Sequence, residues 1–224
     1  MPTDCTPEGG GDPAPESPDR GRLRRAGRRA PRLRLGGGLA LCLGALSLAS
    51  PASPQEMPVP VSVQYPLFVK ALLFDRQFRP RSRDAVVLGI AYQRSFRASL
   101  TAMEALVQAM ADTPDQRVAG LPLRHVLVDL GGHQHLDGIA LPLPQLDLLY
   151  VAPLRAFDLP DLTQASARAG VLTLTGVPNY CRSGVVLGIG SRGGKPTLVV
   201  NLPAARAAGA DFSARLLSLA TVIP

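Results

Sequence analysis

Large aromatic side chains are scarce in this 224-residue sequence, which contains no tryptophan, four tyrosines and six phenylalanines. A core built without them has to be filled by aliphatic side chains, so we expect leucine, valine and alanine to dominate it. The scarcity also bears on function, because nucleic-acid platforms interleave basic residues with aromatic ones. No lysine or arginine cluster of that kind occurs here. The sequence therefore predicts no nucleic-acid partner.

The formal net charge of +7 does not change this interpretation, because the charge is unevenly distributed. Residues 1–35 contain eight arginines and five acidic residues, so the other residues carry a net charge of only +4. Positive charge spread thinly along a chain is typical of an ordinary solvated surface.

Residues 1–52 lack the composition of a folded domain. Residues 1–19 are rich in Pro, Gly, Asp and Glu, which predicts a disordered extension. Residues 20–52 combine an arginine-rich stretch, a short apolar stretch and small residues, which is the pattern of a secretory signal peptide. The apolar stretch is too short to span a bilayer comfortably, and an uncleaved anchor is the alternative. We therefore expect a periplasmic protein with no stable membrane span after cleavage, a Pro-rich linker at 53–60 and one domain at 61–224.

Cysteine is rare as well, with three residues in the whole sequence. Loss of the signal peptide removes Cys5 and Cys42 and leaves Cys181 alone, so no disulfide bond can form within the exported domain. A lone cysteine is either a reactive thiol, open to bonding between chains, or a half-buried structural residue. We favour the structural role.

Motifs of catalysis are also missing from the sequence. There is no GxSxG motif of a serine nucleophile, and no cysteine–histidine pair has a spacing known from catalytic sites. Asp84, Asp129 and Asp147 lie near the ends of predicted strands, where a carboxylate can act as a base, but loop caps and salt bridges explain them more simply. We predict that the chain is not an enzyme and uses no cofactor.

Two short patterns imitate ligand sites. Residues 188–193 satisfy GxGxxG, but that pattern holds a dinucleotide only between a strand and a helix, and here it separates two predicted strands. A hairpin turn is the better interpretation. His133 and His135, flanked by Asp129 and Asp137, can both face a metal ion in an extended chain. No third ligand has a recognised spacing, so we favour a solvated loop and predict no metal.

Apolar runs alternate with helical periodicity through the domain, which favours an α/β fold. The fold class we predict is a mixed, largely parallel sheet flanked by helices, with a C-terminal β-hairpin and short helices. In such sheets ligands gather beyond the carboxyl ends of the strands, so the loops after Tyr92, Leu130, Val151 and Gly176 are the expected working face. The expected elements are a helix in the apolar segment Val61–Phe78 that ends at 74–76, a strand at Ala85–Tyr92, a helix capped by Ser95 with the apolar stripe Phe96, Leu100, Met103, Val107 and Met110, strands at Arg124–Leu130 and Leu146–Val151, a helix capped by Asp158, and a strand at Val171–Thr175.

The C-terminal part is predicted to serve in packing. Val185–Ile189 and Thr197–Val200 form the expected hairpin, joined by the glycine-rich residues 190–196. Two short helices follow, the first capped by Asn201 or Pro203 and ended by Gly209, the second capped by Ser213.

The closing sequence VNLPAARAAGADFSARLLSLATVI resembles the signature of the YfiR (YfiR/HmsC-like) family of periplasmic proteins. In that family a hairpin strand ends in Asn-Leu, an alanine-rich helix follows, and a Leu-Leu-x-Leu-Ala run ends the domain. Residues 147–153 and 170–176 fall where the family has two core strands, and the resemblance covers roughly 61–222. The chain departs from the family at Leu146 and Asp147, where a Cys-His pair often stands, so the family's disulfide bonds are not implied here.

The resemblance implies a regulatory protein. Its partner would be the periplasmic domain of a membrane-bound signalling protein, such as a diguanylate cyclase of the cyclic-di-GMP pathway that it represses. The alternative is a small-ligand-binding module serving a periplasmic sensor kinase or an outer-membrane transporter, in which Arg155, Arg182 and Lys195 pair with an anionic ligand. The candidate ligand or partner contacts are Arg155, Tyr180, Cys181, Arg182, Lys195 and Phe68.

The resemblance also implies a homodimer, and the first predicted helix offers a physical reason. Its apolar residues cannot all face one sheet, because consecutive residues on a helix point about 100° apart. A homodimer through the Phe68 face would bury the surplus symmetrically. The alternative is a helix wedged inside its own domain. The residues concerned are Leu67, Phe68, Ala71, Leu72 and Phe74.

Overall fold

The computed structural model describes residues 56–80, 84–115 and 117–224. The predicted extension at 1–19, the signal peptide at 20–52 and the first residues of the linker lie outside these ranges. Among the described helices, none combines the length and apolar character that crossing a membrane requires. The described end of the linker packs on the domain, since Val59 is buried and the Met57 Sδ atom lies 3.7 Å from the Tyr150 hydroxyl oxygen.

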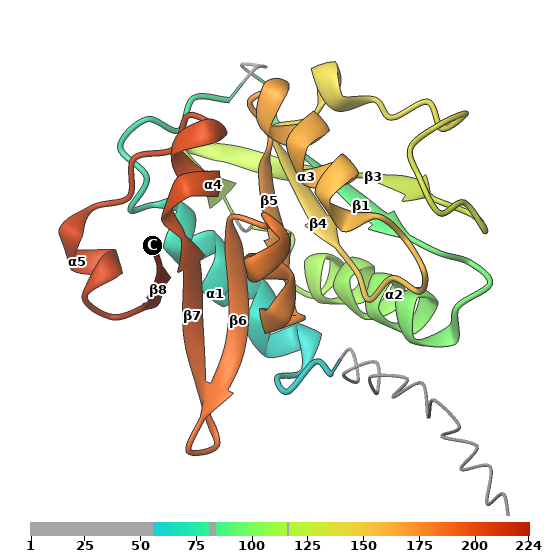
Figure 1. The fold of residues 1–224 in the computed structure, drawn as a ribbon. Coiled ribbons are helices and arrows are strands. Elements are labelled where there is room, and N and C mark those ends of the chain that lie inside the picture. The colour runs from blue at the N-terminus through green and yellow to red at the C-terminus, as the bar shows by residue number, and fades with distance from the viewer. Residues whose placement is uncertain (1–55, 81–83, 116) are drawn as a thin grey trace, which may run out of the picture. The chain divides into compact units, whose positions relative to one another are not determined.

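Eight strands form one sheet in the order β2-β3-β1-β4-β5-β6-β7-β8 (Figure 1). Strands β3, β1, β4, β5 and β6 are parallel, β2 and β7 pair antiparallel with β3 and β6, and β8 runs parallel to β7. The predicted mixed, largely parallel sheet is confirmed. The strands are β1 (Val86–Tyr92), β2 (Arg117–Val118), β3 (Leu121–Asp129), β4 (Leu148–Val151), β5 (Leu172–Thr175), β6 (Leu187–Arg192), β7 (Lys195–Asn201) and β8 (Thr221–Ile223).

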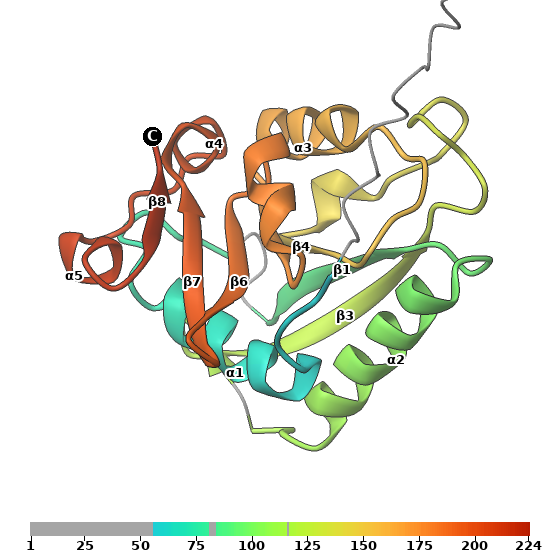
Figure 2. The same ribbon diagram turned by 60° about the horizontal axis from the view of Figure 1, so that its bottom comes forward.

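Helices cover both faces of the sheet (Figures 1 and 2). Helices α1 and α2 enclose one hydrophobic core with alternate residues of β1, β4, β5 and β6. Helix α3 and the 3-10 helix η2 cover the other face, where a second apolar cluster lies. The helices are α1 (Val61–Leu72), α2 (Arg97–Ala111), η1 (Leu143–Gln145), α3 (Leu159–Arg168), η2 (Pro178–Ser183), α4 (Leu202–Ala207) and α5 (Ala214–Leu217).

Helix α1 is wedged between the sheet and its neighbours. Phe68 is only 3% exposed, and its ring meets that of Tyr150 edge-on at 6.2 Å between centroids. On the same side, the buried Gln64 accepts a hydrogen bond from the Tyr150 hydroxyl at 3.1 Å and donates to the Val59 carbonyl at 2.6 Å. The structure thus has the wedged helix that sequence analysis gave as its alternative, and Phe68 lies in the core, away from any dimer surface.

Some predicted boundaries are wrong. Helix α1 ends at Leu72, shortly before the predicted end at 74–76, because Asp75 leaves the helix to pair with Phe212 in an isolated bridge. Helix α2 has Phe96 and not Ser95 at its N-cap, and its buried side is centred on Ala102 and Leu106. The predicted stripe is only partly right, with Met103 and Met110 buried and Phe96, Leu100 and Val107 half-buried.

The C-terminal hairpin is confirmed, with β6 and β7 paired antiparallel and a tighter turn than predicted. Of the two candidate caps, Asn201 is the real one, because its side-chain oxygen accepts a hydrogen bond from the Ala204 N–H at 2.9 Å. Gly209 follows α4 with a φ of +81°, as a helix stop requires. Ser213 occupies the N-cap position of α5 but makes no side-chain cap bond.

Candidate functional site at the carboxyl ends of the parallel strands

The sheet contains a topological switch point at β1. The chain passes from β1 through α2 to β3 on one side, and then returns to place β4 on the other side of β1. Loops leaving β1 and β4 in opposite directions open a crevice at their carboxyl ends, where α/β sheets generally bind ligands.

A cavity of about 350 Å³ lies at this point, and three of the four loops predicted as the working face line it. Its walls are polar and apolar in similar measure, and Arg155 supplies the one cation among the lining residues. A cavity of this size at a switch point fits a small ligand. The lining residues are Gln93, Ser95, Phe96, Gly132, Gln134, Arg155 and Ala156.

Gln93 fixes the loop that carries Arg155. Its buried side-chain amide accepts a hydrogen bond from the Arg155 N–H at 2.7 Å and donates one to the Arg155 carbonyl at 3.2 Å. The Gln93 N–H in turn donates to the Ser99 hydroxyl at 2.9 Å, which ties the same residue to α2. The next residue, Ala156, has a φ of +51°, an unfavourable value for a non-glycine residue that these bonds help to hold.

Tyr180 holds the neighbouring residue of the same loop. Its hydroxyl accepts a hydrogen bond from the Leu154 N–H at 2.7 Å and donates to the Leu154 carbonyl at 3.2 Å. Burial raises the pKa of this phenol to about 12. The loop after β4 is therefore held from two elements, by Gln93 after β1 and by Tyr180 in η2, and Arg155 is presented on a fixed backbone.

Asp129, at the end of β3, joins two other loops of the site. Its carboxylate accepts hydrogen bonds from the Gly131 N–H at 2.9 Å and from the Arg94 N–H and guanidinium, each at 3.2 Å. Burial opposes ionisation, but these hydrogen bonds and the arginine charge hold the pKa of Asp129 below its ordinary value. The carboxylate is therefore a structural cap and ion pair, as the sequence favoured.

The histidines of the 131–138 loop do not meet the partners considered in the sequence. His135 Nδ1 instead lies 3.3 Å from Asp161 Oδ2 and 3.6 Å from Asp158 Oδ2, both at the start of α3. Sequence reasoning missed these two carboxylates because they are more than twenty residues away in the chain. Their spacing of three residues at a predicted helix start was the available signal.

The other candidate residues lie apart from the cavity. Arg182 and Lys195 are exposed but are not among its lining residues. Cys181 is fully buried, its Sγ atom lies 3.9 Å from the Val199 carbonyl oxygen, and burial raises the pKa of the thiol to about 12. Such a thiol stays protonated, which fits the structural role and not the reactive one.

The GxGxxG pattern lies on β6 and the hairpin turn, as predicted. Its glycines serve packing. A Cβ atom at Gly188 would lie 2.5 Å from the Cys181 Sγ atom, and one at Gly190 would lie 3.2 Å from the Pro178 ring. The glycines therefore allow η2 to approach β6, the strand beneath it.

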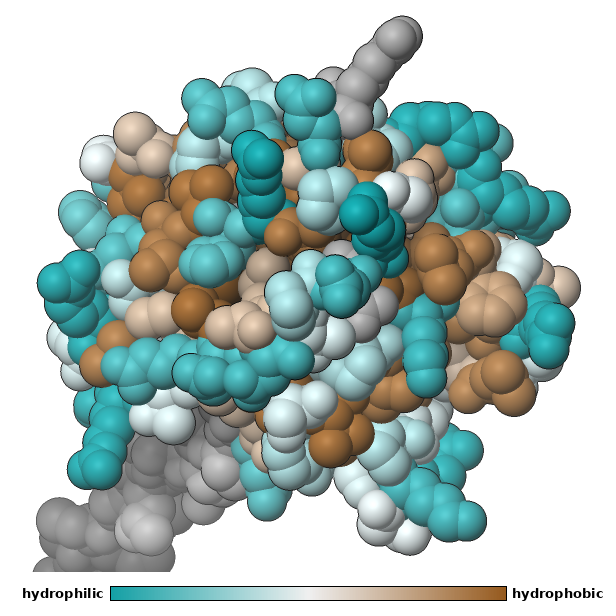
Figure 3. Space-filling model, turned by 180° about the vertical axis from the view of Figure 1, so that it is seen from behind, coloured by the Kyte–Doolittle hydropathy of each residue, from teal (hydrophilic) through white to brown (hydrophobic). Residues whose placement is uncertain are grey.

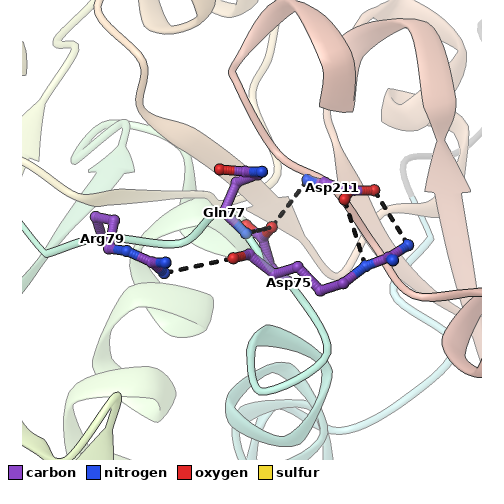
Figure 4. Close-up of polar contacts among 5 residues, drawn as sticks. Asp75, Gln77, Arg79 and Asp211 are labelled. Carbon is purple, nitrogen blue, oxygen red and sulfur yellow. Dashed lines mark hydrogen bonds and ion pairs between the residues drawn. The ribbon is translucent and has the colours of Figure 1, made fainter.

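A second cavity, of about 130 Å³, lies at the amino ends of β4 and β5. Asp75 at its wall is buried, and its carboxylate accepts hydrogen bonds from the Gln77 N–H at 3.0 Å and the Asp211 N–H at 2.8 Å (Figure 4). Arg76 pairs with the Asp211 carboxylate at 3.3 Å. These contacts attach the end of α1 to the C-terminal segment, which explains the polar groups here as structural.

Residues 81–221, more than half of the chain, match the sequence model of a family described as YfiR/HmsC-like. The comparison with curated proteins finds no match.

Two solved structures are similar in fold. One is a conserved domain protein from Vibrio cholerae O1 biovar El Tor, with 15% identity over 73% of this chain and 60% of that chain and a TM-score of 0.48. The other is an ABC domain in complex with L-Trp from Streptococcus pneumoniae, with 16% identity over 73% of this chain and 62% of that chain and a TM-score of 0.49. The chain thus spans about three fifths of the length of these structures.

Proposed function

The chain belongs to the YfiR/HmsC-like family, and from this membership we propose a periplasmic regulatory protein that binds and represses a membrane-bound signalling protein, such as a diguanylate cyclase. The family match over residues 81–221 is the observation that carries the proposal. Repression would follow from a higher affinity for the inactive state of the partner than for its active state. A signal in the cell envelope would then act by changing the stability of the complex.

An apolar groove between the start of α1 and α2 suits a partner of this kind. Its volume is about 700 Å³, and the two helices that form it lie side by side (Figure 2). Such grooves accept the apolar face of an amphipathic helix, which is the partner element we propose. The groove is lined by Met57, Val61, Phe96, Arg97, Ala98, Thr101, Ala102 and Ala105.

Affinity capture tests this proposal. The tagged, exported protein is incubated with detergent-solubilised membranes, and the captured proteins are identified. We expect a membrane-bound signalling protein to be captured by the parent and by Glu104→Arg, but not by Thr101→Arg. Both positions are exposed on α2, and only Thr101 lines the groove. Capture of abundant porins alone contradicts the repressor proposal, and equal capture by both variants contradicts the groove.

We also propose a homodimer, but through the edge of β3 and not through the Phe68 face of the first helix. Strand β3 has β2 beside only Leu121 and Pro122, and no described strand covers the rest of that edge. Val126 and Leu127 on it are 40% and 46% exposed. On the side opposite to Figure 1, apolar residues form several groups separated by polar ones (Figure 3). Backbone pairing of two β3 edges needs no broad apolar patch, and it would extend the sheet through a twofold axis.

The second candidate function, small-ligand binding, is favoured by the cavity at the switch point. Arg155 stands there on a loop fixed by Gln93 and Tyr180, which suits a small anion. A thermal-shift screen with anionic metabolites and muropeptides tests it, with Arg182→Ala as the control for Arg155→Ala. A screen without any shift for the parent contradicts this function and leaves the repressor proposal standing.

A further inference from the structure

Three potential metal ligands converge beside the cavity, from two segments distant in the sequence. His135 comes from the loop after β3, and Asp158 and Asp161 come from the start of α3. Their ligand atoms all lie within 4.8 Å of one another, and the imidazole Nδ1 atom is 3.3 Å from one carboxylate and 3.6 Å from the other.

These two separations match the spacing of ligand atoms around a zinc ion. Zinc bonds to imidazole nitrogen and carboxylate oxygen are about 2.1 Å long, so two ligand atoms at a tetrahedral angle lie about 3.4 Å apart. An ion can therefore be placed between the imidazole and the carboxylates with small side-chain rotations. All three side chains are partly exposed, so the ion would have access from solvent.

The backbone holds the two segments together without using the carboxylates. The Asp158 N–H donates a hydrogen bond to the Gln134 carbonyl at 2.6 Å, directly beside His135. Asp158 occupies the N-cap of α3, where an aspartate usually accepts a hydrogen bond from the first turn, yet its side chain makes no such bond. Its carboxylate is directed to His135 instead, and Asp161 lies one turn further along the same face.

We propose that His135, Asp158 and Asp161 form a zinc-binding site. One imidazole and two carboxylates give a donor set that suits zinc, with at least one position left for water or for an anionic group of a ligand. Magnesium is a poor alternative, because it prefers an octahedral shell of oxygen atoms. Bound zinc would join the 131–138 loop to α3 and so stabilise one wall of the cavity. The site does not depend on the proposed repressor function.

Calorimetric titration of zinc chloride into the chelator-treated protein tests the site. We expect one zinc ion per chain, and a melting temperature that rises with zinc because the ion binds only the folded chain. His135→Ala and Asp161→Asn are each expected to weaken zinc binding roughly tenfold or more. His133→Ala, in the same loop but outside the cluster, should leave zinc binding unchanged, and an excess of magnesium should not compete.

The zinc-free melting temperatures of the variants separate loss of the site from loss of the fold. His135 is exposed, so His135→Ala should melt at the temperature of the parent when no zinc is present. The proposal is overturned if the parent binds no zinc, or if His133→Ala loses as much affinity as His135→Ala. In either case the three side chains form only an ion pair at the start of α3.

Discussion

Single buried polar residues hold the loops at the carboxyl ends of the parallel strands. Gln93 and Tyr180 each use one side chain to bind both the N–H and the carbonyl of a residue in the loop after β4. These hydrogen bonds could not be predicted from the sequence. A glutamine directly after a strand, for example, is typical of an exposed loop residue. Arg155 and Tyr180 were both candidates from the sequence, but the hydrogen bonds by which Gln93 and Tyr180 fix the Arg155 loop were visible only in the structure.

The buried thiol and phenol of η2 predict a loss of stability at alkaline pH. The pKa values of Cys181 and Tyr180 are both raised to about 12 by burial, whereas in the unfolded chain they are about 8.5 and 10. The folded chain thus keeps protons that the unfolded chain loses. The free energy of unfolding should be unaffected by these groups below about pH 8.5, and should fall by about 1.4 kcal/mol per pH unit for each group above its unfolded pKa.

Urea unfolding at several pH values between 8 and 11 measures this slope. Cys181→Ala should be less stable than the parent throughout, because it leaves a small cavity, but its stability should fall less steeply above pH 8.5. Tyr180→Phe should change the slope only above about pH 10. Identical slopes in the parent and Cys181→Ala would show that the thiol is not held protonated in the folded chain.

At the scale of elements, the order of helices and strands follows from the sequence, but their ends depend on tertiary contacts. Apolar residues continue past Leu72 to Phe74, so the sequence predicted a slightly longer first helix that ends at 74–76. The helix stops early because Asp75 accepts a backbone hydrogen bond from the distant Asp211 N–H. Strands β2 and β8 are only 2 and 3 residues long and give no periodic signal, so they were missed.

Replacing Asp75 tests how strongly the C-terminal segment depends on α1. Asp75→Ala removes the acceptor of two partly buried hydrogen bonds, from the Gln77 and Asp211 N–H groups, so we expect a loss of about 1–3 kcal/mol in the free energy of unfolding. Arg76→Ala is the matched control, because it removes an exposed ion pair to Asp211 and should cost less than about 1 kcal/mol. Urea denaturation of both variants measures these losses in the free energy of unfolding. Equal losses would contradict the structural role of the Asp75 carboxylate.

At the scale of the whole molecule, alternation of strands and helices was enough to predict the sheet, and the position of the candidate site follows from that topology. The meeting of His135 with α3 was beyond the sequence, because it depends on how two loops pack. The dimer surface predicted at Phe68 is wrong for a related reason, since Phe68 is buried in the core. Apolar residues on more than one face of α1 indicate burial, but only the fold shows that the sheet and neighbouring helices of the same chain cover them.

Light scattering on the purified protein tests assembly through the β3 edge. We expect the mass of a dimer for the parent and of a monomer for Leu127→Lys, because a lysine on an edge strand opposes pairing with a second edge. Leu73→Lys is the matched control, since Leu73 is an exposed leucine at the end of α1, and it should stay dimeric. Phe68→Glu places a charge in the core, so it should reduce the stability of the fold and not act on the interface alone. If the parent is a monomer, the dimer proposal is wrong. If Leu127→Lys is still a dimer, the interface lies elsewhere than at the β3 edge.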